Sequence, residues 1–231
     1  GISVSGGSDK TQYLVSTSYY DEQGIIKTSG YKRFNARVNI NTLLAKWLNL
    51  TANISFTNEK RLTVPEGSGS ILKQALYESP MLYLHNNKGY WYSNNPLAVL
   101  DRDNDKVHTN RLDMNLGVDI KLCKYLTYQF KTSFYTVHYV DDNFFAVWGL
   151  DEDFTMPYSL SSVYKYQSTA NKWEVNNLLT FIWSGKRHNL TMLAGQTAEG
   201  YKHSYQQSSR YGTPSNESIF HYLSSAYTGD K

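Results

Sequence analysis

The chain has 231 residues, 23 basic and 20 acidic residues scattered along it, and a formal net charge of +3, so no basic block suggests a nucleic-acid partner. A single cysteine, Cys123, excludes an internal disulfide framework and any multi-cysteine metal site. No apolar run approaches the ~18 residues of a membrane-spanning helix, which excludes a helical membrane protein but leaves open a transmembrane β-barrel, whose strands alternate.

Four segments show alternation of apolar and polar residues, and each predicts a two-faced β-strand. They are residues 33–41, 47–57, 111–122 and 126–134. In the second segment the apolar set is Leu48, Leu50, Ala52, Ile54 and Phe56. These strands exceed the ~5–6 residues usual in soluble sheets and suit a tilted crossing of a bilayer.

The expected connections alternate between short and long. Short ones fall near residues 7–10, 43–46, 122–124 and 184–187, and long ones near 21–30, 60–106, 139–171 and 201–218. This alternation is typical of an up-and-down barrel with tight turns on one side of the membrane and large loops on the other. About nine strands are expected.

Three hairpins resemble one another. Ala45–Leu48 recurs 78 positions later as Cys123–Leu126, and Gly185–Leu190 is a looser copy. An aromatic residue beside the turn is what an interfacial girdle would place there, although any β-meander can reuse good turn chemistry.

The longest loop, residues 60–106, predicts a short helix near residues 71–78 that Pro80 would stop. Aromatic side chains follow in the loops, and we expect them to bind ligand: Tyr90, Trp91, Tyr92 and Trp148. Aromatic faces stack on the apolar faces of sugars and keep a polar edge for hydroxyl groups. The alternative is that they pack the loops together or against a partner protein.

Catalytic and metal-binding motifs are not found. The six histidines form no ligand pair at helical spacing, and no HExxH, GxSxG, P-loop or GxGxxG sequence occurs. The acidic stretch Asp101–Asp105 is followed by Lys106, where a calcium loop needs glycine. We therefore expect no catalytic residue, no metal site, no cofactor and no enzymatic activity.

Several stretches, in order and spacing, resemble the SusC/RagA family of TonB-dependent outer-membrane transporters. They are Ile2–Thr11 running into Tyr19–Lys27, Tyr31–Leu48, Asn95–Ala98 with Thr109–Arg111, and Lys186–Gly195. The resemblance covers nearly the whole chain. It is specific to the family, but not to a substrate.

The resemblance implies an all-β fold: an antiparallel up-and-down segment of a plugged barrel of ~22 strands. Residues 1–231 would be the early-to-middle part of the barrel domain, without the plug domain, the TonB box and the C-terminal strands. It also implies import of large nutrients, chiefly oligosaccharides and sometimes peptides, across the outer membrane of a Gram-negative cell. The implied partners are a SusD-like surface lipoprotein, the TonB complex through the absent N-terminal part, and outer-membrane lipid.

In such a barrel the polar strand face would look into the lumen, toward the plug. Its charged members are Arg33, Arg37, Arg111 and Lys131. The competing hypothesis is a soluble or cell-surface β-sheet module that binds carbohydrate or protein. That module would bury the apolar face against a second sheet, whereas a barrel exposes it to lipid.

Overall fold

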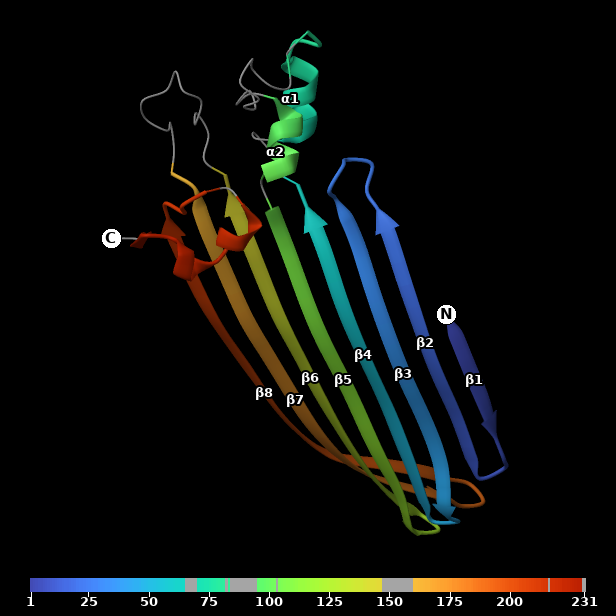
Figure 1. Ribbon diagram of the computed structural model, residues 1–231. Helices are drawn as coiled ribbons and strands as arrows, with labels where there is room; N and C mark the ends of the chain where they lie inside the picture. Colours follow the sequence, from blue (N-terminus) through green and yellow to red (C-terminus); the bar gives the residue numbers. More distant parts are fainter. Residues whose placement is uncertain are drawn as a thin grey trace.

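The computed structural model describes residues 1–64, 70–81, 83, 95–102, 104–146, 160–215 and 217–229. They form one antiparallel sheet in which nine strands follow one another in chain order (Figure 1). The strands are β1 (Ile2–Gly7), β2 (Thr11–Gln23), β3 (Gly30–Ala45), β4 (Leu48–Thr63), β5 (Asn104–Cys123), β6 (Leu126–Phe145), β7 (Ser162–Ser184), β8 (Asn189–Tyr211) and β9 (Thr228–Gly229). This topology confirms the predicted up-and-down arrangement, and within the described residues the sheet is open, with β1 and β9 at its edges.

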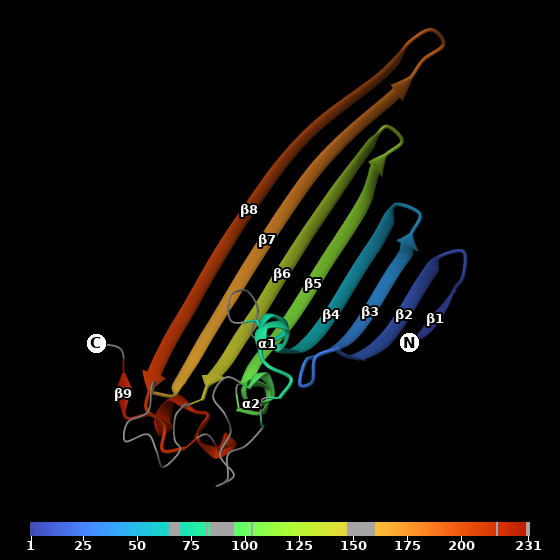
Figure 2. The same ribbon diagram turned by 90° about the horizontal axis from the view of Figure 1, so that it is seen from above.

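The two ends of the sheet differ. Figures 1 and 2 show the tight turns that follow β1, β3, β5 and β7 gathered at one end, here called the turn end. The opposite, loop end carries two short helices, α1 (Ile71–Tyr77) and α2 (Pro96–Arg102), and the segment after β8. Among the described residues no helix is long and apolar enough to cross a membrane.

Strand register separates the residues into two faces, because directly paired residues point to the same side of a sheet. One register row joins Val15, Val38, Ile54, Met114, Phe134 and Trp173. The adjacent row, on the other side, joins Ser16, Arg37, Ser55, Asp113, Tyr135 and Lys172. We call these sides the apolar face and the polar face.

The apolar face carries a continuous band of apolar side chains, which we call the apolar band. On β7 it runs from Trp173 to Trp183, with Val175, Leu179 and Phe181 between them. Ten residue steps span about 34 Å along a strand, which a tilt of 35–45° reduces to about 24–28 Å. A membrane barrel needs an apolar band about 25 Å tall with aromatic residues at both borders, so β7 has the required length.

On β7 one polar residue interrupts the band, and its side chain is hydrogen-bonded. Asn177 lies on the apolar face of β7, and its Oδ1 accepts a hydrogen bond from Tyr128 Oη at 2.6 Å. Side chains of the band are otherwise uncovered by any layer of the described residues: Leu116 is 40% exposed, Phe134 41% and Met192 58%. The buried clusters lie at the loop end instead, around Leu100 and around Phe144.

The repeated hairpins have a common geometry. Ala45 pairs with Leu48 and Cys123 with Leu126, so each turn consists of two residues, Lys-Trp in one and Lys-Tyr in the other. Both hairpins also have a register irregularity at the same place before the turn. The recurrence found in the sequence is therefore a repeat in three dimensions.

The strands extend further toward the loop end than alternation predicted. We expected β6 to end near Tyr139 and β8 near Tyr201, whereas they reach Phe145 and Tyr211. The connection from β2 to β3 is correspondingly short. Beyond the apolar band polar residues occur on both faces, so the two-residue period fades from the sequence although the backbone ladder continues.

The predicted helix is confirmed as α1, with the Ser70 side chain accepting a hydrogen bond from the Lys73 amide. Helix α2 was not predicted. It begins at an Asn-Pro pair, with the amide of Leu97 donating to Asn95 Oδ1 at 2.9 Å. Ile71 of α1 packs against Val99 and Leu100 of α2, which joins the two helices above the loop end of β4 and β5 (Figure 1).

Candidate functional site

The polar face carries a cluster of tyrosine and charged residues at the loop end, which we call the tyrosine belt. Two adjacent polar-face rows build it across β2 to β8. The first row holds Tyr20, Arg33, Glu59, Tyr139 and Tyr205, and the second holds Glu22, Tyr31, Arg61, Asp141 and Tyr166. The apolar-face row between them contains Lys32, Lys60 and His108, so the belt lies beyond the apolar band.

The tyrosines form two aromatic groups. On β2 and β3 the rings of Tyr20 and Tyr31 have centroids 6.1 Å apart. On β6 to β8 the ring of Tyr166 contacts Tyr139 edge-on and Tyr205 in a stacked arrangement, each at 6.0 Å between centroids. The ring of His203 continues this second group at 6.0 Å from Tyr205. Tyr205 is 67% exposed and Tyr20 46% exposed, so both groups offer open ring surface.

Charged groups lie between the two aromatic groups. Tyr31 Oη donates a hydrogen bond to Glu59 Oε1 at 2.9 Å. Four buried atoms of this region have no hydrogen-bond partner among the described residues: Arg111 Nε, Asp105 Oδ1, Asp141 Oδ1 and Asn143 Oδ1. Buried polar atoms are normally paired, so the middle of the belt and the rows beside it have unused donor and acceptor capacity.

The surroundings of Asp141, Tyr139 and Tyr31 favour the neutral forms of these three groups. Burial, followed by the negative charge of Asp105, raises the pKa of Asp141 above its ordinary value. Burial, followed by the charge of Asp141, likewise raises the pKa of Tyr139. Burial and the hydrogen bond to Glu59 raise the pKa of Tyr31. A cation or a hydrogen-bond donor from a ligand would relieve this crowding of acceptors.

The belt can therefore bind but shows no arrangement for bond chemistry. Exposed tyrosine rings supply flat apolar surface with a polar edge, and the centre supplies donors and acceptors. Within the ranges that the structure describes, no three His, Cys, Asp or Glu side chains lie close enough together to hold a metal ion.

The four basic residues predicted to line the lumen share the polar face by register. Arg33 belongs to the belt, and Arg111 lies in the next row toward the turn end. Arg37 and Lys131 lie further toward the turn end, Arg37 opposite Ser55 and Lys131 opposite Gly117. The predicted ligand-binding aromatics, Tyr90, Trp91, Tyr92 and Trp148, lie outside the described residues.

Sequence reasoning missed the tyrosines of the belt. Tyr139, Tyr166 and Tyr205 were assigned to long loops, where their shared side could not be recognised. A signal was present, because Tyr164 and Tyr166 on β7, and Tyr201, His203 and Tyr205 on β8, follow the two-residue period of a strand.

No protein-family model matches the chain. It is 31% identical over 149 residues to the TonB-dependent receptor SusC of Bacteroides thetaiotaomicron, which covers 52% of this chain and 15% of that receptor. It is 23% identical over 215 residues to the TonB-dependent receptor P3 of Formosa agariphila, which covers 84% of this chain and 20% of that receptor. The chain thus spans a fifth or less of the length of these curated relatives.

Solved structures of the RagAB peptide importer have the same fold. The closed-closed state superimposes with a TM-score of 0.76 at 20% identity, covering 98% of this chain and 26% of that chain. The open-open state gives the same TM-score and covers 99% of this chain. The chain is thus similar in sequence to TonB-dependent receptors, and it shares its fold with the RagAB importer structures.

Proposed function

We propose that this chain forms part of the wall of a TonB-dependent importer of large nutrients in the outer membrane of a Gram-negative cell. The observation that carries the proposal is the two-faced sheet. Its apolar band is as tall as a bilayer core and is bordered by tryptophans on β7. Its opposite face is polar and ends in the tyrosine belt.

In this proposal the apolar face contacts lipid and the polar face lines the lumen. Arg33, Arg37, Arg111 and Lys131 then face the interior, where a plug or a passing substrate can pair with them. Residues 1–231 are the early-to-middle part of the barrel domain, and the plug domain, TonB box and closing C-terminal strands belong to other parts of the receptor. A SusD-like lipoprotein caps the loop end, and the TonB complex supplies energy through the plug.

Oligosaccharides are the substrates that the belt fits best. Two exposed aromatic groups flank a polar centre, which matches a chain of sugars that alternates apolar faces with hydroxyl groups. The residues Tyr90, Trp91, Tyr92 and Trp148 extend this aromatic surface in the proposal. Peptides are the second substrate class to test, because the RagAB relatives import peptides.

The test measures binding to the intact receptor in detergent, by calorimetry, with an array of oligosaccharides and an array of peptides. Tyr166→Ala with Tyr205→Ala removes one aromatic group, and loss of stacking should weaken oligosaccharide binding about 3-fold to 10-fold per ring. Tyr19→Ala is the matched control, because Tyr19 neighbours Tyr20 but lies on the apolar face. Unchanged oligosaccharide affinity in the double variant would refute the belt as a binding site.

The soluble binding module predicts a different location. It requires a second layer over the apolar face, and no described residue forms one over the apolar band. Cell fractionation decides between the two: the importer is extracted from the outer membrane only by detergent, whereas the module is recovered in the aqueous fraction.

A further inference from the structure

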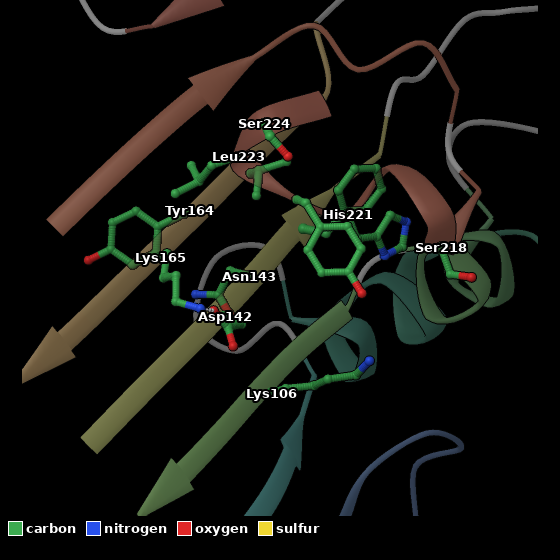
Figure 3. Close-up of a pocket in the computed structure, with 12 residues that line it drawn as sticks. Lys106, Asp142, Asn143, Tyr164, Lys165, Ser218, His221, Leu223 and Ser224 are labelled. Atoms are coloured by element: carbon green, nitrogen blue, oxygen red, sulfur yellow. Dashed lines mark ion pairs between the residues drawn. The ribbon is translucent and has the colours of Figure 1, made fainter. Parts of the chain in front are cut away.

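A pocket lies on the apolar face at the loop end, beneath the segment that follows β8 (Figure 3). This segment contains two short 3-10 turns, η2 (Ser218–Phe220) and η3 (Leu223–Ser225). The His221 ring stacks on Phe144 with centroids 3.6 Å apart. Arg210 Nη1 donates to the Leu223 carbonyl at 3.1 Å. Phe144 belongs to the apolar face, so the segment covers the side that the proposed function turns toward lipid.

The pocket is built to receive an anion. Its volume is about 430 Å³, and hydroxyl groups of Ser218, Ser224 and Tyr222 line it together with two lysines. Lys165 Nζ is paired with Asp142 Oδ1 at 3.0 Å. Lys106 is exposed and forms no ion pair with any described residue. One ammonium group and several hydroxyl donors therefore remain for a ligand.

The pocket belongs to a wider basic surface, which we call the basic collar. Beyond the apolar band, the apolar face of β2 to β8 carries the basic residues Lys32, Lys60, Lys106, Lys165, Lys202 and Arg210. Among the residues paired between strands, the acidic residues on this part of the apolar face are Asp21 and Asp142. Asp21 is bonded to Lys32 at 2.9 Å and Asp142 to Lys165, so Lys60, Lys106 and Lys202 are unpaired within the described residues.

The collar begins at the border of the band and rises well above it. Lys202 is two residues beyond Gly200, and Lys106 is six residues beyond Leu112. With the strand rise and tilt, these positions stand about 5 Å and about 15 Å above the band. A phospholipid headgroup layer is only about 5–8 Å thick. The collar therefore fits a taller headgroup, one that carries phosphate on sugar.

We propose that the basic collar and its pocket bind the phosphate groups of a glycolipid headgroup in the outer leaflet. This inference rests on the proposed function, because it needs the apolar face to contact lipid. The acyl chains lie against the apolar band, while Lys202, Lys60 and Lys106 hold phosphates at increasing height. Lysine binds phosphate as a point charge, and clusters of basic residues beside a bilayer recognise anionic headgroups.

The test measures binding of fluorescent bisphosphorylated lipid A to the intact receptor in neutral detergent, by titration. Lys60→Gln, Lys106→Gln and Lys202→Gln together should weaken binding on the order of a hundredfold, since each basic residue beside an anionic surface contributes about fivefold. The matched control removes three lysines at the turn end: Lys46→Gln, Lys124→Gln and Lys186→Gln. The control should bind as the unmodified receptor does.

Competitors identify the source of the phosphate. Dephosphorylated lipid A should bind much more weakly, and inorganic phosphate and phosphatidylglycerol should displace the probe only poorly. Equal losses in the two triple variants, or equal displacement by inorganic phosphate, would overturn the glycolipid site.

Oligosaccharide binding is measured on the same samples and separates the two proposals. If the collar variant binds both oligosaccharide and lipid A as the unmodified receptor does, the glycolipid site is refuted and the proposed function is not. A receptor recovered in the aqueous fraction refutes both.

Discussion

The assignment of the apolar face to lipid predicts that one added charge destabilises the barrel far more at one position than at its neighbour. Leu116 lies near the middle of the band on β5 and is paired with Ala52 on β4. Asn115 is its neighbour in the chain, lies on the polar face and pairs with Asn53. Leu116→Arg and Asn115→Arg thus introduce the same side chain at the same depth, on opposite sides of the wall.

The expected difference follows from where each guanidinium is placed. Arginine at the lipid-facing midplane of a barrel costs about 2–4 kcal/mol, and lumen-facing substitutions have no such cost. Leu116→Arg should therefore lower the folding equilibrium constant by roughly 30-fold to 1,000-fold, at about 1.4 kcal/mol per tenfold change. Asn115→Arg should change it by less than about 1 kcal/mol.

The assay is reversible denaturant unfolding of the intact receptor in phospholipid vesicles, followed by tryptophan fluorescence. Leu122→Arg, at the turn-end border of the band, is a depth control, because the cost falls to about 0–1 kcal/mol at the interfaces. Equal destabilisation by Leu116→Arg and Asn115→Arg would refute the assignment of faces. A larger loss of stability in Asn115→Arg than in Leu116→Arg would mean that the polar face contacts lipid.

Three further predictions concern the loop end. Asn95→Ala removes the side-chain cap of α2 and should cost about 1 kcal/mol, seen as faster amide exchange in that helix and not in the strands. Asp141→Asn removes a carboxylate whose pKa is raised by burial and by Asp105. Stability from protonated Asp141 is lost as pH rises through that raised pKa. The variant should therefore equal the parent in acid and be more stable at neutral pH, by a few tenths to about 1 kcal/mol. A difference between the two unfolding midpoints that does not change with pH would contradict this. His221→Ala removes the ring stacked on Phe144 and should cost about 0.5–1.5 kcal/mol, measured as easier proteolysis after β8; unchanged cleavage would show that the stacking does not hold the segment.

The sequence was sufficient wherever one face is apolar. In β4 and β5 the two-residue period has a single physical cause, a polar side and an apolar side, and it predicts both the strand and its two faces. Short connections near residues 43–46 and 122–124 were predicted from the same alternation, and the structure refines them to the two-residue turns Lys46-Trp47 and Lys124-Tyr125. The order of strands then follows, since short turns join neighbours.

The loop end could not be predicted in the same way. The upper parts of β6 and β8 carry polar residues on both faces, so hydrogen bonding to a neighbouring strand, and not a two-residue pattern, makes them strands. The tyrosine belt depends on register across seven strands, which no local window contains. Helix α2 could have been predicted from the sequence, because asparagine followed by proline is a typical helix start.

The extension of the ladder beyond the band has a mechanical consequence. From Leu112 to Asp105 the backbone of β5 remains paired on both sides, so the upper wall cannot bend outward without breaking several backbone hydrogen bonds at once. In a closed barrel this upper part of the wall is stiff, and the number of strands fixes its inner diameter. Any change in the size of the entrance must then come from the connecting segments and from whatever covers them, while the wall itself serves as their rigid mount.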